Sequence, residues 1–155
     1  MGKVNFSHLL ALIARLMLTG TFVLAALPKI KDPLAFAASV SAFRVVGPEL
    51  SNWVALSLPW LELVIGIGIL LPQIRLSSSI LIATLLLAFI GLHASAWIRG
   101  LEISCGCFGT ESAAESTNYL WLIMRNLLLL GACLLVIYKD RTIGSVFSKQ
   151  AIPRN

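Results

Sequence analysis

The sequence predicts an all-α membrane protein: a four-transmembrane-helix bundle with a short amphipathic interfacial helix between the first two spans. Of its 155 residues, 58% are hydrophobic and 12% are charged, whereas soluble domains carry roughly 45–50% apolar and about 25% charged residues. The mean hydropathy is +0.91. Four apolar windows of about 20 residues are each long enough to cross about 30 Å of hydrocarbon. This composition excludes an ordinary water-soluble enzyme.

The predicted spans follow these windows in order. They cover about Leu9–Leu27, Trp53–Leu71, Ser77–Trp97 and Tyr119–Tyr138, with aromatic rings at several edges, where the headgroup region favours them. The first span is expected to end at Pro28 and the second at Pro72, because proline breaks the helical hydrogen-bond ladder. Residues 1–155 are thus predicted to form a single integral membrane domain with a cytoplasmic tail at 139–155.

The first span differs from a cleaved signal peptide in two respects. Its apolar stretch exceeds the roughly 7–15 residues of a signal core, and Arg15 lies within it. We therefore expect this segment to be retained as a membrane helix, despite the small-residue pair Ala25-Ala26.

A short amphipathic helix is predicted over about residues 33–46. Apolar residues recur there at helical intervals after an Asp32-Pro33 start signal, namely Leu34, Phe36, Val40, Phe43 and Val46. Such a helix would lie on the outer face of the membrane. It could either cap the bundle or cover a site.

Basic residues outside the spans predict the orientation. With a cytoplasmic N-terminus, the inner side holds Lys3, Arg75, Lys139, Arg141, Lys149 and Arg154, and the outer side holds Lys29, Lys31, Arg44 and Arg99. The excess on the inner side predicts cytoplasmic N- and C-termini and an outward-facing third loop. In a bacterium this would be an inner-membrane protein with a periplasmic third loop.

The third loop carries the string Ser104-Cys105-Gly106-Cys107-Phe108-Gly109. Two thiols one residue apart can close only a small, strained ring, and strain makes a disulfide labile. Gly106 tolerates the backbone angles of such a ring, and Gly109 keeps the loop supple. Phe108 offers an apolar anchor against the membrane. The pair therefore favours thiol–disulfide exchange.

Two other interpretations of the cysteine pair remain open. The thiols could be unreactive, or they could form a structural disulfide within the loop. They could also bind Cu(I) or Zn²⁺ as two thiolates, but His93 is the only nearby imidazole and no further ligand is evident, so no metal is expected. Cys133, within the fourth span, is interpreted as a small buried hydrophobe.

Ionisable residues within the spans mark a second candidate site, because charges in hydrocarbon are costly. Arg15, Glu62 and Arg125 form a predicted intramembrane cluster, with His93 in the outer half of the third span. Arg15 lies deeper than the others and could instead snorkel toward the inner side. Glu62 is expected to pair with Arg125 or Arg15. The surplus arginine could polarise a quinone carbonyl or hold an anion. The cluster could equally be structural, and His93 could be a bundle residue or a proton relay.

These residues together resemble the MauE/DoxX family of redox-associated membrane proteins, most of all its MauE branch. The resemblance is carried by Arg15 with Gly20, by Lys29 with Asp32-Pro33, by Pro59 with Glu62, and by the string from Cys105 to Gly109. It implies a helical bundle that works with a periplasmic thioredoxin-like (MauD-like) protein. It also implies a role in maturing a disulfide-containing protein such as the methylamine dehydrogenase small subunit.

The sequence thus leads to the hypothesis of a membrane thiol–disulfide relay. A partner thiolate attacks a Cys105–Cys107 disulfide, the second cysteine resolves the mixed disulfide, and electrons leave through a quinone or another protein. Two rival functions stay open: a small carrier for an anion or soft metal, and a non-catalytic assembly subunit of an oxidoreductase complex.

Overall fold

The chain folds into five helices, and no strand occurs among the residues described. The computed structural model describes residues 6–101 and 118–150. The helices are α1 (Phe6–Lys31), α2 (Pro33–Ala42), α3 (Pro48–Gly68), α4 (Arg75–Ile98) and α5 (Tyr119–Gln150). All of them except α2 are long and apolar enough to cross a membrane. The predicted fold class is confirmed.

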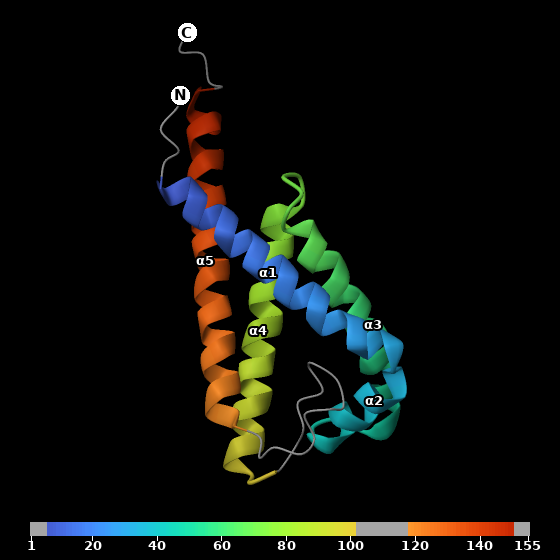
Figure 1. The fold of residues 1–155 in the computed structure, drawn as a ribbon. Helices are drawn as coiled ribbons and strands as arrows, with labels where there is room; N and C mark the ends of the chain where they lie inside the picture. The colour runs from blue at the N-terminus through green and yellow to red at the C-terminus, as the bar shows by residue number, and fades with distance from the viewer. Residues whose placement is uncertain (1–5, 102–117, 151–155) are drawn as a thin grey trace.

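The four long helices alternate in direction and form a bundle with two distinct ends (Figure 1). Helices α4 and α5 run side by side, whereas α1 packs against α3 and crosses α5. Short helix α2 packs on α3 at the same end of the bundle as the end of α4 and the start of α5, and we call this the α2 end. The α3–α4 turn lies at the opposite end, which we call the turn end.

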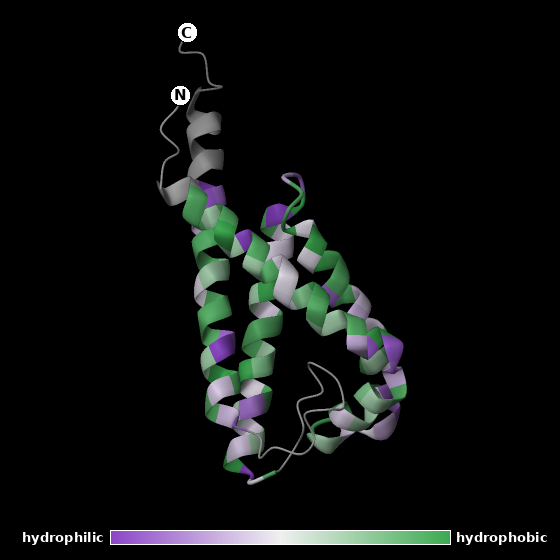
Figure 2. Ribbon diagram, in the orientation of Figure 1, coloured by the Kyte–Doolittle hydropathy of each residue, from purple (hydrophilic) through white to green (hydrophobic). Residues whose placement is uncertain are grey.

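The bundle buries a narrow apolar core and leaves a broad apolar surface. The core side chains include Leu18, Phe22, Ile69, Ile82 and Val136. Long stretches of all four spanning helices are hydrophobic in Figure 2, and many large apolar side chains on their outer faces are exposed. So large an exposed apolar surface is not tolerated in water, but a lipid bilayer covers it. The chain is a multi-pass membrane protein.

Three helix ends differ from the sequence prediction. Helix α1 continues through Pro28 to Lys31, α3 ends at Gly68 before Pro72, and α5 continues beyond Tyr138 to Gln150. Proline is tolerated inside membrane helices where neighbouring helices and local adjustments satisfy the backbone. The extension of α1 matters most, because it brings Lys29 into the bundle.

Helix α2 starts where the sequence predicts it. The Asp32 carboxylate accepts a hydrogen bond from the Ala35 amide at 2.9 Å, and Pro33 occupies the first turn. The helix ends at Ala42, earlier than the predicted residue 46. Its buried face places Phe36 and Ala37 against Ala55 of α3, so α2 covers this end of the bundle.

Candidate functional site

A buried ion pair joins α1 to α3 near the α2 end. The Lys29 ammonium donates to both carboxylate oxygens of Glu62, with an Nζ–Oε1 distance of 2.7 Å and an Nζ–Oε2 distance of 2.8 Å. Both side chains are 2% exposed. Lys29 continues the buried face of α1 that carries Leu18, Phe22 and Ala26 at helical spacing. Each charge neutralises the other where a lone charge would be costly.

The same ammonium also lies over two aromatic rings. Lys29 Nζ is 4.9 Å from the ring centroid of Phe36 on α2 and 5.5 Å from that of Phe89 on α4. Ring faces attract a cation within about 6 Å. Lys29 therefore connects α1 with three other helices.

A small cavity beside the ion pair, which we call the polar chamber, gathers polar side chains from α1, α3, α4 and α5. Its volume is about 30 Å³, and its polar lining is Thr21, Lys29, Glu62, His93, Arg125 and Asn126. Such a volume holds roughly one water molecule. The side-chain nitrogen of Asn126 is buried without a hydrogen-bond partner among the described residues. The chamber therefore has an unsatisfied donor for water or another small acceptor.

His93 stands beside this chamber on α4 and is 3% exposed. Its Nδ1 lies 2.5 Å from the carbonyl oxygen of Phe89. Because a carbonyl only accepts, this hydrogen bond requires the proton on Nδ1, which leaves Nε2 as the nitrogen that can gain or lose a proton. Phe43 packs edge-on against the imidazole, with ring centroids 5.9 Å apart. His93 is thus held in one orientation by its own helix and by the chain just after α2.

A larger cavity, which we call the apolar cavity, lies beneath α2 between α3 and α4. Its volume is about 170 Å³, and its lining includes Phe36, Val40, Phe43, Val54, Leu58 and Leu92. Lys29, Phe89 and His93 line both this cavity and the polar chamber. An apolar space therefore adjoins a polar one, with an ammonium and an imidazole at their shared wall.

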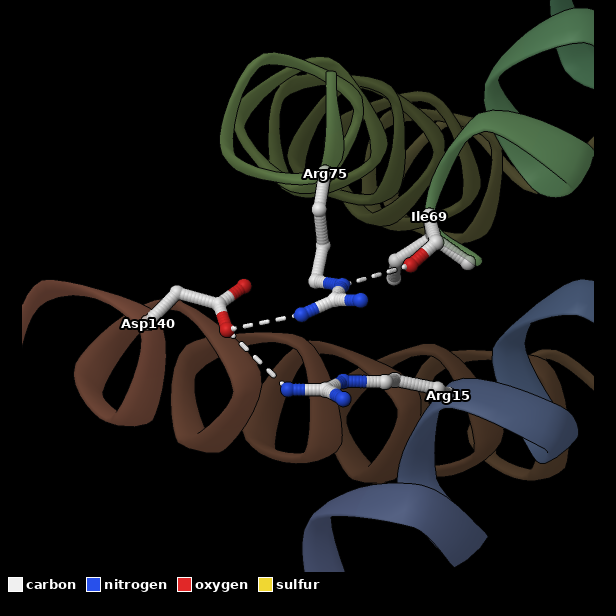
Figure 3. Close-up of polar contacts among 4 residues, drawn as sticks. All are labelled: Arg15, Ile69, Arg75 and Asp140. Atoms are coloured by element: carbon white, nitrogen blue, oxygen red, sulfur yellow. Dashed lines mark hydrogen bonds and ion pairs between the residues drawn. The ribbon is translucent and has the colours of Figure 1, made fainter. Parts of the chain in front are cut away.

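A second ion cluster lies at the turn end of the bundle (Figure 3). Arg15 of α1 and Arg75 of α4 approach the same carboxylate oxygen of Asp140 on α5, at 3.0 and 3.4 Å. Arg75 also donates to the carbonyl oxygen of Ile69 at 3.2 Å. The cluster ties three helices to the α3–α4 turn.

The structure divides the ionisable residues differently from the sequence prediction. Glu62, Arg125 and His93 do line one chamber. Arg15 does not join them, because it pairs with Asp140 at the other end. Glu62 pairs instead with Lys29, which was expected outside the spans. The fourteen residues from Arg15 to Lys29 correspond to about 21 Å of helix rise, so α1 carries one cation to each end.

The predicted cysteine site, Cys105 and Cys107 with Gly106, Phe108 and Gly109, lies outside the described residues.

The residues that flank this segment are described. The Tyr119 hydroxyl donates a hydrogen bond to the carbonyl oxygen of Leu101. Leu101 and Tyr119, on either side of this segment, therefore meet at the α2 end.

Comparison with known proteins assigns the family. The family model described as methylamine utilisation protein MauE matches residues 7–139. The chain belongs to the MauE family. It is 33% identical over 123 residues to "Methylamine utilization protein MauE" of Paracoccus denitrificans, which covers 79% of this chain and 65% of that protein. It is 27% identical over 143 residues to the protein of the same name from Methylophilus methylotrophus, covering 92% of this chain and 75% of that protein. No solved structure matches the chain.

Two of the features that carried the resemblance to MauE, Lys29 with Asp32-Pro33 and Pro59 with Glu62, lie together in the structure. Arg15 lies at the turn end instead. Lys29 and Glu62 form the buried ion pair. Pro59 is buried on the same face of α3, one turn before Glu62. Asp32 caps α2, which begins at Pro33. In this member of the MauE family, these features build the wall between the two cavities and the helix that covers them.

Proposed function

We propose that this chain is a membrane thiol–disulfide exchange protein that supports methylamine utilisation. Its relatives are named methylamine utilization proteins, and the cysteine pair at 105 and 107 supplies the exchange chemistry. The partner is a periplasmic thioredoxin-like protein of the MauD type. The protein that this exchange helps to mature is a disulfide-containing one, such as the methylamine dehydrogenase small subunit.

One observation carries this proposal: the cysteine-bearing connection is anchored at the end of the bundle that holds both cavities. Arg99, just after α4, donates to the carbonyl oxygen of Phe43 at 3.0 Å. The Tyr119 hydroxyl at the start of α5 donates to the carbonyl oxygen of Leu101. Both ends of the connection therefore lie next to the buried site.

The exchange balances in two steps. A partner dithiol reduces a Cys105–Cys107 disulfide through a mixed disulfide, so that the partner becomes oxidised and the pair becomes two thiols. A quinone then takes two electrons and two protons from these thiols, which restores the disulfide and yields a quinol. Electrons thus flow from the periplasmic partner into the membrane.

The proposal includes a membrane and an orientation. The chain lies in a bacterial inner membrane with both termini in the cytoplasm, as the excess of inner basic residues indicates. The cysteine pair then faces the oxidising periplasm, where disulfides persist.

A mixed-disulfide trap tests the exchange. Cys133→Ala is introduced first, so that the pair holds the only thiols of this chain. Cys105→Ser or Cys107→Ser is then added, and the remaining thiol is activated as a mixed disulfide with thionitrobenzoate. Each variant is incubated with the reduced thioredoxin-like partner whose resolving cysteine is replaced by serine, so that its thiolate displaces thionitrobenzoate and no second thiol releases the complex. We expect at least one single variant to form a covalent complex that dithiothreitol releases. The double serine variant is the control and should form none.

Complementation of methylamine growth gives the second measurement. A strain that lacks its own MauE protein receives the double serine variant, and membrane insertion is verified by fractionation. We expect insertion without growth. Growth at the wild-type rate would contradict the proposal and favour a non-catalytic assembly role.

A further inference from the structure

The apolar cavity has the size and lining of a site for one six-membered ring. A cavity of about 150 Å³ lined by apolar side chains is enough to bind benzene, and this one measures about 170 Å³. Phe36, Phe43 and Phe89 place three phenyl rings in its wall. Aromatic rings stack favourably against one another in offset or edge-to-face geometry. The lining therefore suits a flat, apolar ring.

The cavity is accessible from outside the bundle. Val45, which follows α2 in the chain, lines the cavity and is 55% exposed. Val40 and Val54, from α2 and α3, lie in the same wall. The wall of the cavity therefore reaches the protein surface beside α2, which is the side from which we expect a lipid-soluble ligand to enter.

The polar wall of the cavity favours a neutral acceptor. The Lys29 ammonium has three N–H donors, and Glu62 accepts two of them. The ammonium also lies over the rings of Phe36 and Phe89, which line this cavity, and a ligand oxygen there would accept the third N–H in place of a ring face. Because Glu62 already neutralises the ammonium, a ligand carboxylate would add a second negative charge to a buried and balanced pair. A ketone oxygen accepts the hydrogen bond without that cost.

We propose that the apolar cavity binds the ring of a lipid-soluble quinone, with the Lys29 ammonium donating to one ring carbonyl. This inference rests on the proposed function, for which it supplies the electron acceptor site. It moves the quinone from the arginine-based cluster predicted by the sequence to the cavity beneath α2. His93, in the wall of both cavities, is the group placed to pass protons to the ring oxygen as the quinone becomes a quinol.

Direct binding tests the proposal on the full chain purified in detergent. A photoreactive azidobenzoquinone is crosslinked to the protein and the labelled peptides are mapped by mass spectrometry. Decylubiquinone serves as the competitor, and palmitate tests for a carboxylate ligand. We expect labelling of peptides from α2, α3 or α4 that line the cavity, with competition by decylubiquinone and not by palmitate.

Two variants and a matched control locate the site. Val40→Trp fills the cavity, and the double variant Lys29→Met/Glu62→Gln removes the donor without leaving a lone buried charge. The double variant should weaken decylubiquinone binding by about tenfold or more, the value of one charged hydrogen bond. Val40→Trp should weaken it by about tenfold or more because the indole occupies the space of the ring. Val64→Trp adds the same bulk to the outer face of α3, where Val64 is 61% exposed, and should change binding by less than about twofold, as for other surface substitutions.

The outcomes separate this proposal from the exchange function. Competition by palmitate, equal losses in Val40→Trp and Val64→Trp, or crosslinks away from the cavity would each overturn the quinone site. If the mixed disulfide nevertheless forms, the exchange function stands and its electrons go to another acceptor. If quinone binds as expected but no mixed disulfide forms, the site stands and the exchange function fails.

Discussion

Lys29 on α1 and Glu62 on α3 form a two-point ion pair, with Nζ 2.7 Å from one carboxylate oxygen and 2.8 Å from the other. Lys29 lines both the apolar cavity and the polar chamber, and Glu62 lines the chamber. Because both side chains are almost fully buried, neither charge can be hydrated if its partner is lost. The pair therefore couples the packing of α1 and α3 to the shape of both cavities.

The first prediction concerns this coupling. Glu62→Gln leaves the Lys29 ammonium buried without a counter-charge, and we expect it to destabilise the bundle by about 3–5 kcal/mol. Lys29→Met/Glu62→Met removes both charges and should recover most of that loss, because an apolar pair replaces a desolvated ionic one. Thermal unfolding in detergent measures both. Equal losses in the single and double variants would show that the two charges are not coupled.

How far the sequence predicts the site depends on where a span is taken to end. The four spans and the Asp32-Pro33 start of α2 follow from apolar length and capping chemistry, and the structure contains them. The sequence prediction places Lys29 outside the first span, because Pro28 predicts the end of that span. The signal that could have found it is the buried face of α1, where Phe22 and Ala26 lead at helical spacing to Lys29.

The pairing of charges could not be predicted in the same way. Arg15 and Asp140 are 125 residues apart and meet only because α1 and α5 cross at the turn end. Sequence gives the approximate depth of each charge along its helix, whereas the partner depends on how the helices pack. For that reason the sequence predicts an ion pair of Glu62 with an arginine, whereas the structure pairs Glu62 with Lys29.

The second prediction concerns the contact of α1 with α3. A Cβ at Gly66 would lie 3.0 Å from the Cβ of Phe22, which cannot rotate away. Gly66→Val should therefore force the two helices apart and cost about 1–3 kcal/mol. Gly91 on α4 has open space around it, so Gly91→Val is the matched control and should cost far less. Equal melting temperatures for the two variants would contradict the close packing of α1 on α3.

The third prediction concerns the ion cluster at the turn end. Asp140→Asn removes the charge that Arg15 and Arg75 share, and we expect a loss of about 1.5–3 kcal/mol, as for hydrogen bonds to charged groups. The loss should shrink at high salt, because these groups are partly exposed and ions screen the repulsion between the arginines. Melting temperatures are measured at low and high salt. Arg141→Gln, on an exposed neighbour, is the control and should leave stability within about 0.5 kcal/mol.

The fourth prediction separates the third cysteine from the proposed exchange chemistry. Cys133 is fully buried on α5, and its thiol donates to the carbonyl oxygen of Ser79 at 3.0 Å. In the Cys105→Ser/Cys107→Ser variant it is the only thiol left, and N-ethylmaleimide should label it only after unfolding in hot detergent. Cys133→Ala should cost about 1 kcal/mol of packing. Combined with Cys105→Ser or Cys107→Ser, it should capture the thioredoxin-like partner as well as the same single variant that keeps Cys133. Fast labelling of the folded double serine variant, or loss of capture when Cys133→Ala is added, would mean that this thiol takes part in the exchange.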